Sequence, residues 1–495
     1  MGDGHRPVIG FDFGTSTTLV AADATLVWIG TTTAWMPSLV GYDDDGSVVV
    51  GEEAAFARPG QVIRSVKRTI TERRSRVRVE APYGVPDVSA DDLMAAVLRK
   101  AVRRASVQDV DVFDPSRLYL GCPAMWDGRQ RRRLLDVAHQ VGLPATLATL
   151  VDEPVAAGIA WLAGHPSTEP LRVLVFDMGG GTLDIAVLDV LDTREISVLA
   201  AVSLAEAGDA LDDTIAEDLD YALGANGVEV DALDRPDLAW ELLLDAARKV
   251  KIGLTTEVEF PIVLPPDMFG PNEIWYTREQ LNVAFAPQLD LAEEYVAAAL
   301  RVAHLTSADP GSAAELARRP IEDLVSTVDV VVLSGGMSQV PYVRARLRDL
   351  FPPTTRLEFA TTAPELSVVL GLARAAEFSW TNAFRPAFDV LLEYEQQSRV
   401  VYEAYQPLVE PWQVARGDRD LRFVRTAADL SLPADGTGKL RLVCHSSEPL
   451  VATLDGASLD GFPVAFGEEF EFSIYPNGRI RVVDAAGLHH GNALT

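Results

Sequence analysis

The chain has 495 residues, which is too long for one compact core and predicts two to four folding units. Hydrophobic residues make up 48% of it and charged residues 23%, a composition that excludes a disordered or fibrous protein. Lysine and arginine total 43 against 72 aspartate and glutamate residues, and the net charge of −29 repels nucleic-acid phosphates and anionic membranes. We therefore expect neither nucleic acid nor membrane as a partner.

The N-terminus and the cysteines predict a cytoplasmic protein. Met1 to Pro7 contain no apolar core, and no stretch reaches about 18 consecutive apolar residues, so neither a secretion signal nor a membrane span is predicted. Cys122 and Cys444 lie far apart, without metal-ligand or disulfide spacing, which is typical of a reducing compartment. Each cysteine is expected to fill a core.

The first predicted element is a β-hairpin with a tip of small residues. Residues 8–13 are apolar and favour strand, Gly14, Thr15 and Ser16 follow, and residues 17–22 favour strand again. The same pattern returns at 173–190, which indicates an internal duplication. A repeat this long predicts two similar lobes and not a stacked array. The corresponding pairs are Asp12 and Asp177, Gly14 and Gly179, and Thr17 and Thr182.

The rest of the chain alternates helices and strands and then becomes mainly β. A third glycine turn, Gly335-Gly336, follows a buried-strand pattern within 328–341, and the basic residues of 64–78 predict a solvated helix face. Beyond residue 378 short alternating runs take over, and Asn477-Gly478 is a strong hairpin signal. The helices are predicted at 90–105, 128–141, 154–162, 238–254, 278–302 and 364–378.

The two duplicated turns have the chemistry of a phosphate site. Glycine-rich turns let backbone N–H groups approach phosphates without interference from side chains. Asp12 and Asp177 each lie two positions before the first glycine of their turn, where a carboxylate can hold a hydrated Mg²⁺. The sequence contains neither the GxxxxGK[ST] motif of a P-loop nor a GxGxxG motif that opens a helix, so neither the P-loop nor the Rossmann mode of nucleotide binding is indicated. The sequence therefore predicts a clamp on magnesium phosphate from two sides.

Several segments, in this order, resemble the nucleotide-binding half of the seventy-kilodalton heat-shock chaperones. The resemblance covers about residues 8 to 378 and implies a duplicated actin-like (ribonuclease-H-like) ATPase fold of two lobes, followed by a mainly β domain. The segments that carry it are GFDFGTSTT, RSVKRTI, GCPAMWDGRQRRRLLDVAHQVGL, LVDEPVAAGIAWLAG, VFDMGGGTLDIAVLDV and VVLSGGMSQVPYV.

The resemblance implies ATP and Mg²⁺ as cofactors and a role for each matching residue. Lys67, Glu153, Asp177 and Thr182 would carry hydrolysis, with Lys67 at the γ-phosphate and Glu153 at the attacking water. Asp12, Asp177 and Asp184 would surround the magnesium, partly through water. The residues that would bind nucleotide are Asp12, Gly14, Thr15, Ser16, Thr17, Gly179, Gly180, Gly181, Thr182, Asp184, Gly208, Lys251, Thr255, Gly335, Gly336, Ser338, Gln339 and Glu365.

Plainer interpretations of three of these residues stay open at this stage. Glu153 precedes Pro154 at a helix start, where an acid also favours the helix dipole. Lys67 could be a solvated charge, and Asp184 could be an ordinary hairpin residue.

The base pocket departs from the family pattern. Gln339 stands where the family usually has a basic residue, and Arg248 stands where it usually has a glutamate, while Glu365 replaces an aspartate and Ala207-Gly208 a double glycine. The base and ribose contacts are therefore less secure than the phosphate contacts.

The resemblance also implies a domain division and a signalling route. Residues 1–380 would form the nucleotide-binding domain, with lobe I at about 1–170 and lobe II at about 171–380. Residues 381–394 would be a linker and 395–495 a β-sandwich-like domain without a helical lid. Residues 389–394 could equally be the first strand of that domain. Pro123 and Arg131 occupy the positions of the family's switch, and helices 155–160 and 369–376 those of its inter-lobe hinge.

Three functions follow as hypotheses. The first is an ATP-hydrolysing chaperone-like protein whose nucleotide state controls a β domain that binds unfolded polypeptide, together with a co-chaperone or exchange factor. The second is an actin-like nucleotide switch that recruits one specific protein partner. The third, a small-molecule kinase on the same fold, fits the paired Lys67 and Glu153 and the trailing β domain poorly.

Overall fold

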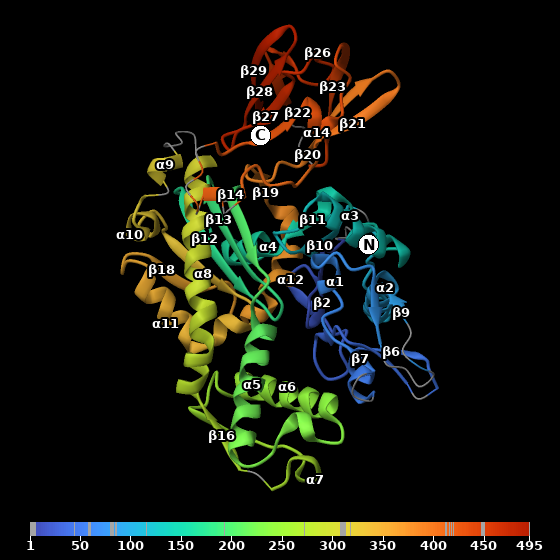
Figure 1. Ribbon diagram of the computed structural model, residues 1–495, viewed down its shortest axis with the longest axis vertical. Coiled ribbons are helices and arrows are strands. Elements are labelled where there is room, and N and C mark those ends of the chain that lie inside the picture. Colours follow the sequence, from blue (N-terminus) through green and yellow to red (C-terminus); the bar gives the residue numbers. More distant parts are fainter. Residues whose placement is uncertain are drawn as a thin grey trace, which may run out of the picture.

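The structure is a computed structural model, and Figure 1 shows two lobes side by side with a β region at one end of them. It describes residues 6–43, 45–57, 61–79, 84, 87–114, 116–192, 194–271, 273–306, 313–316, 318–410, 413–414, 416, 418, 420–446 and 451–494. No described helix is long and apolar enough to cross a lipid bilayer.

Lobe I is built on a sheet in the order β11-β10-β1-β2-β3, with β4 paired to β2. Strand β1 is antiparallel to β2 and parallel to β10, so the first hairpin lies at the centre of the sheet. The bounds are β1 (Ile9–Phe13), β2 (Thr17–Ala22), β3 (Thr25–Val27), β4 (Met36–Pro37), β10 (Leu118–Cys122), β11 (Leu150–Asp152), α2 (Ala90–Ser106), α3 (Gly128–Gln140) and η2 (Leu147–Thr149).

Smaller elements extend lobe I away from this sheet. They are sheet β6-β5-β7, hairpin β8-β9 and the short helix α1, which begins directly after Lys67. The bounds are β5 (Val40–Tyr42), β6 (Val48–Val50), η1 (Gly51–Phe56), β7 (Val62–Ile63), α1 (Arg68–Thr71), β8 (Arg76–Arg78) and β9 (Asp87–Ser89).

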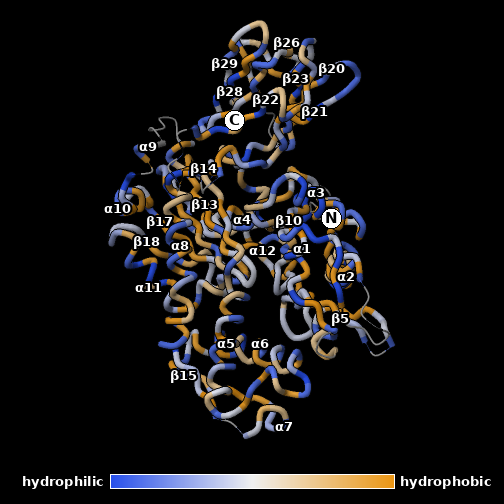
Figure 2. The backbone as a smooth tube through the Cα atoms, viewed as in Figure 1, coloured by the Kyte–Doolittle hydropathy of each residue, from blue (hydrophilic) through white to orange (hydrophobic). Residues whose placement is uncertain are grey.

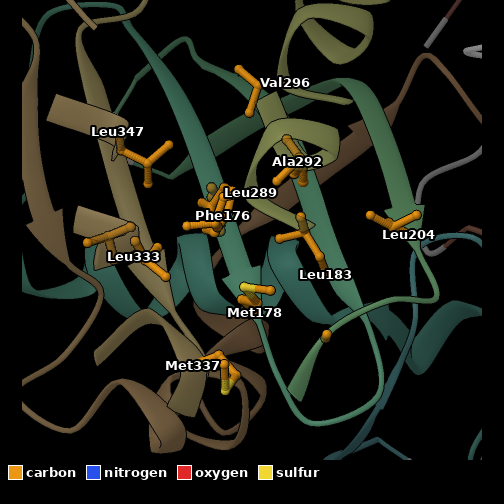
Figure 3. Close-up of a cluster of buried hydrophobic side chains, with 14 of the residues drawn as sticks. Phe176, Met178, Leu183, Leu204, Leu289, Ala292, Val296, Leu333, Met337 and Leu347 are labelled. Atoms are coloured by element: carbon orange, nitrogen blue, oxygen red, sulfur yellow. The ribbon is translucent and has the colours of Figure 1, made fainter. Parts of the chain in front are cut away.

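Lobe II repeats the arrangement in a sheet ordered β18-β17-β12-β13-β14-β19. Its four central strands β17, β12, β13 and β14 are largely buried because α4 (Glu153–Gly164) and α8 pack against them. Leu289 of α8 belongs to the same hydrophobic cluster as Phe176 and Leu183 (Figure 3). Figure 2 shows hydrophobic residues concentrated along these strands. The bounds are β12 (Leu171–Met178), β13 (Leu183–Val190), β14 (Glu195–Leu204), β17 (Val330–Ser334), β18 (Arg356–Phe359), β19 (Ser379–Asn382), α8 (Arg278–Thr306), α9 (Ala313–Leu316), α10 (Ile321–Val325) and α11 (Pro341–Leu350).

Helices α5 and α6 form the outer part of lobe II. They pack against each other, and α5 begins directly beside the second glycine turn. The bounds are α5 (Gly208–Ala225), η3 (Val230–Ala232), α6 (Pro236–Gly253), β15 (Glu259–Ile262), α7 (Pro266–Phe269), β16 (Ile274–Thr277) and η4 (Gly336–Gln339).

The lobes meet where α4 crosses α12. A Cβ added at Gly371 would lie 1.8 Å from the Ala156 carbonyl oxygen, and one added at Gly10 would lie 2.4 Å from the Val369 carbonyl oxygen. Glycine at these positions therefore allows the backbones to approach closely. The elements of this crossing are α4 (Glu153–Gly164), η5 (Pro364–Leu366), α12 (Ser367–Leu372) and η6 (Ala375–Glu377).

The C-terminal region consists of two sheets around its own core, ordered β21-β20-β23-β26 and β22-β27-β28-β29-β24-β25. Residues 389–394, for which linker and strand were equal alternatives, lie in β20, which pairs with β21 and β23. The bounds are β20 (Phe388–Tyr394), β21 (Gln397–Tyr402), β22 (Phe423–Thr426), α14 (Ala427–Leu430), β23 (Gly436–Cys444), β24 (Val451–Leu454), β25 (Ala457–Ser458), β26 (Pro463–Phe466), β27 (Glu471–Ile474), β28 (Arg479–Asp484) and β29 (Gly487–Leu494).

Three sequence predictions require correction. Residues 364–378 form one short α-helix between two 3-10 turns, because the chain must bend around the crossing with α4. The basic run is not one solvated helix face: helix α1 ends at Thr71 and strand β8 follows. Cys122 is buried as expected, but Cys444 is exposed at the end of β23.

Candidate nucleotide site

The two duplicated turns have the same backbone geometry and face each other. The Gly14 N–H donates to the Thr17 carbonyl at 2.9 Å, and the Gly179 N–H donates to the Thr182 carbonyl at 3.0 Å. A Cβ added at Gly180 would lie 2.4 Å from Ser16 Oγ. The turns therefore approach each other across the gap between the lobes.

These turns carry backbone donors that the protein does not use itself. Within the described part of the chain, the N–H groups of Thr15, Ser16, Gly180 and Gly181 have no hydrogen-bond acceptor. Successive backbone N–H groups that the protein does not use, in two facing turns, form a concavity that suits an anionic ligand. The phosphate cradle predicted at these turns stays a prediction, and the free N–H groups support it.

Three buried aspartates lie at the base of the turns. Asp177 is opposite Asp184 across β12 and β13, and Asp12 occupies the equivalent place in lobe I. Burial, Asp184 and Glu153 raise the pKa of Asp177 well above its ordinary value. Burial and Glu153 raise the pKa of Asp12 to about 7, although Lys67 opposes the shift. Burial and Glu153 raise the pKa of Asp184 to about 6.

Lys67 and Glu153 form an ion pair beside these aspartates. Lys67 Nζ lies 2.5 Å from Glu153 Oε1, and the lysine is only 2% exposed. The rings of Phe13 and Trp126 flank its ammonium at 5.9 and 5.5 Å. Burial alone would lower the pKa of Lys67, but Glu153 and Asp12 outweigh it and raise the pKa. Lys67 is thus not a solvated charge.

The charge balance of the site fits a divalent cation. Asp12, Asp177, Asp184 and Glu153 bring four carboxyl groups together with one ammonium group, and their raised pKa values reflect this excess of negative charge. Among the described residues no three acidic, histidine or cysteine side chains converge on one metal position. Mg²⁺ would therefore be held largely through its own waters, as it commonly is.

The residues predicted to contact the base and ribose fall into two groups around this centre. Lys251 pairs with Asp212 at 2.6 Å and donates to the Gly208 carbonyl at 2.7 Å, while Gly208 N–H donates to the Gly179 carbonyl. Gln339 donates to Glu365 at 2.9 Å.

Turns around Asp177 hold the second of these groups. The Gly335 N–H donates to the Pro364 carbonyl, and Ser338 Oγ donates to the Gly335 carbonyl. A Cβ added at Gly335 would lie 2.8 Å from Asp177 Oδ1. Thr255 belongs instead to the first group, because it follows α6, which contains Lys251, and its hydroxyl donates to the Ile252 carbonyl at 2.7 Å.

Sequence reasoning missed the contacts that close the cleft. Ser65 Oγ donates to Asp209 Oδ2 at 3.0 Å, Arg68 lies 3.8 Å from the same carboxylate, and the Asp209 N–H donates to the Gly180 carbonyl. It also missed Ser203, whose hydroxyl donates to Asp184. Residues 65 and 209 belong to different lobes, and no local pattern links them.

Arg131 connects this centre to the C-terminal region. It forms an ion pair with Asp152, the residue before Glu153, and is 1% exposed. Its guanidinium lies 4.4 Å from the centre of the Tyr405 ring, and the Tyr405 hydroxyl donates to the Leu147 carbonyl at 3.0 Å.

Other contacts fasten the same two parts together. Arg132 forms ion pairs with Glu403 and Asp389, and a Cβ added at Gly128 would lie 2.7 Å from the Ala404 carbonyl oxygen. The C-terminal region therefore packs against helix α3 of lobe I.

The duplicated sheets, the facing glycine turns and the central carboxylates define a protein of the actin-like, two-lobed nucleotide-binding class. The family model described as Hsp70 protein matches residues 8–377. The chain belongs to this family of chaperone-like ATPases.

The curated relatives are distant and longer. The "Chaperone protein dnaK" of Cyanidioschyzon merolae is 28% identical over 376 residues, which are 69% of this chain and 57% of that protein. The "Chaperone protein DnaK" of Burkholderia cepacia is 26% identical over 74% of this chain and 58% of the relative. That of Thermotoga neapolitana is 26% identical over 79% of this chain and 63% of the relative. The chain thus spans about three fifths of the length of these relatives.

Proposed function

We propose that this chain binds Mg-ATP between its lobes and hydrolyses it, and that nucleotide state controls the binding of unfolded polypeptide by the C-terminal β region. Lys67 and Glu153 would place the γ-phosphate and the attacking water, with Thr182 beside the γ-phosphate. Phosphoryl transfer of this kind depends on positioning and on neutralising charge. Mg²⁺ would supply the charge neutralisation, held near Asp12, Asp177 and Asp184.

The observation that carries the proposal is the continuity from Glu153 to Tyr405. Asp152 and Glu153 are neighbours at the start of α4, Arg131 holds Asp152, and the Tyr405 ring covers Arg131. Undocking of the C-terminal region would expose Arg131 to water and weaken its hold on Asp152, because an ion pair is stronger when it is shielded from solvent. A change at the β region can therefore reach the hydrolytic group through three contacts.

A second function, a nucleotide switch that recruits one partner, is favoured by the edge strand β21. Its first residues, Gln397, Ser398 and Arg399, are exposed and polar. A polar edge suits a partner with a matching surface better than it suits unfolded chains of many sequences. A panel of unrelated unfolded polypeptides separates these functions, because a chaperone binds many of them and a switch binds none.

The proposal is tested by single-turnover hydrolysis of radiolabelled ATP, with and without a reduced, unfolded polypeptide. We expect the polypeptide to accelerate hydrolysis by the wild-type chain and to have no effect on Tyr405→Ala. The matched control is Tyr475→Ala, because Tyr475 also lies near an arginine, Arg422 at 5.7 Å, but within the C-terminal region. An equal response of both variants to polypeptide would refute the route through Arg131.

A further inference from the structure

A cavity of about 670 Å³ lies where lobe I, lobe II and the C-terminal region meet. Gln130 of α3, Ser203 of β14 and Tyr295 of α8 line it, together with Arg385 and Gln406 from the chain beyond β19. None of the phosphate-turn residues lines this cavity. It is thus a separate space from the cleft between the two glycine turns.

Arg385 is the feature of this cavity that calls for a ligand. Its side chain is buried at 5% exposure, and Nη1 donates to the Tyr405 carbonyl at 3.0 Å. Its Nε has no hydrogen-bond partner, and no carboxylate of the described residues lies within 4.0 Å of its guanidinium. Arg131, which is equally buried, has Asp152 as its partner. Burying a charge without a counter-ion is costly in free energy. Asp152 offsets this cost for Arg131, and no described carboxylate does so for Arg385.

The charges around Arg385 do not supply that counter-ion. Burial and the charge of Arg131 lower the pKa of Arg385, while the smaller effects of Asp152 and Glu410 act in the opposite direction. Asp152 already pairs with Arg131. Glu294 and Glu410 line the cavity and form no ion pair among the described residues, so both carboxylates would repel an incoming anion.

Two of the other arginines of the wall have carboxylate partners. Arg73 pairs with Asp127 at 3.0 Å, and Arg129 lies 3.7 Å from Glu403. Arg425 lies 4.8 Å from the centre of the Phe423 ring. Arg385, which itself lies 5.3 Å from the centre of the Phe384 ring, is thus the buried arginine of the wall without an ion pair among the described residues. A guanidinium presents several donors to the oxygens of a phosphate group.

We propose that this cavity binds a small oxyanion of the phosphate class, received by Arg385 at the junction of the three parts of the molecule. The anion can be free orthophosphate or the phosphate group of a small molecule, because the cavity is larger than orthophosphate needs. Its binding would strengthen the docking of the C-terminal region, because Arg385 also holds the Tyr405 carbonyl. This site does not depend on hydrolysis of ATP.

The test is a calorimetric titration of the full, nucleotide-free chain with orthophosphate, against chloride at matched ionic strength. We expect saturable binding that Arg385→Gln weakens about 10- to 100-fold, which is the usual value of hydrogen bonds to a charged group. Glu410→Gln should tighten binding, because it removes a carboxylate that would repel the anion. Arg344→Gln is the matched control, since Arg344 also has a buried Nε without a partner and lies near Phe359, outside the cavity.

Titration with glycerol phosphate identifies the source of the phosphate group, and titration of Arg385→Gln identifies the place of binding. Glycerol phosphate that binds more tightly than orthophosphate points to a phosphorylated small molecule, and the reverse order points to the free ion. Orthophosphate bound in the glycine turns would be unaffected by Arg385→Gln, and this result would overturn the proposal. Absence of saturable binding by the wild-type chain would also overturn it. If Arg385→Gln does not fold, an unchanged affinity in Glu410→Gln would count against the site.

Discussion

The two duplicated hairpins differ in the residue that lies opposite the first aspartate, and this difference gives each lobe its own set of charged side chains. In lobe II Asp177 is opposite Asp184, whereas in lobe I Asp12 is opposite Leu19. Leu19 packs with Val369 and Ala373 of the crossing between the lobes. The turns are alike in both lobes, but only lobe II has a second carboxylate at this place. Lobe I contributes the ion pair of Lys67 and Glu153 beside Asp12 instead, so the two halves bring different charged side chains to the gap between them.

The largest effect is expected from the ion pair of lobe I. Lys67→Ala removes the ammonium beside Glu153 and should slow single-turnover cleavage of ATP about 10²- to 10⁴-fold. Lys249→Ala is the control, because Lys249 pairs with Asp245 on the surface. An equal loss in both variants, or no loss in Lys67→Ala, would contradict the assignment.

A smaller effect is expected from the extra carboxylate of lobe II. Asp184→Asn keeps the shape of the side chain but removes its charge, so the Mg²⁺-dependent part of ATP affinity should fall about 10- to 100-fold. Titration with ATP in the presence and absence of Mg²⁺ measures this part. Asp189→Asn, on the same strand but paired with Arg172, should leave it unchanged. Affinity that is independent of Mg²⁺ in the wild-type chain would argue against a metal at this place.

The raised pKa values predict proton release when Mg-ATP binds. Burial and Glu153 raise the pKa of Asp12 to about 7 and that of Asp184 to about 6, both above the ordinary aspartate value of 3.8. Because the folded chain holds these two protons more tightly than the unfolded chain, they raise the free energy of unfolding. This contribution is fully present below pH 4 and is lost as the pH rises to about 7. A divalent cation reverses the shift, so protons should leave on binding between pH 6 and 7.

Calorimetry in buffers of different ionisation enthalpy measures this release. We expect a smaller release from Asp12→Asn, and that variant should also be less sensitive to pH between 4 and 7 when thermal unfolding is followed without nucleotide. A release that is equal in both chains would show that Asp12 is already ionised.

Part of this site could be predicted from the sequence, because local motifs carry it. The spacing of Asp12 from Gly14 and of Asp177 from Gly179 identified the turns, and the order of the segments led to Lys67 and Glu153. The contact of Ser65 with Asp209 and the stacking of Tyr405 on Arg131 were not predictable. They join residues that are far apart in sequence, and only the packed fold determines which distant side chains meet.

The elements of the fold could also be predicted from the sequence only in part. Helices with a clear apolar period, such as α2 and α8, were predicted, and their cores are buried. Residues 364–378 were predicted as one helix because their composition favours it, yet the close crossing with α4 breaks it. Helix α5 was not predicted, although it begins at Gly208 beside the second turn.

The smallest effect tests the crossing between the lobes. Gly371→Ala places a Cβ 1.8 Å from the Ala156 carbonyl oxygen, so one helix must shift, at a cost of about 1–3 kcal/mol in unfolding free energy. Gly164→Ala is the control, because nothing lies within 4 Å of its added Cβ. Denaturant unfolding compares the two variants, and equal stability would mean that the helices can separate without cost.

The central claim is that Glu153 acts on the water that cleaves ATP, and Glu153→Gln tests it most directly. Equilibrium binding of Mg-ATP and single-turnover cleavage would be measured on the same preparations of wild-type and variant chain. The account predicts that the variant binds Mg-ATP within about threefold of the wild type, while cleavage falls about 10²-fold or more. Cleavage at the wild-type rate by the variant would contradict the role of Glu153, and a wild-type chain that binds ATP without cleaving it would support the nucleotide switch.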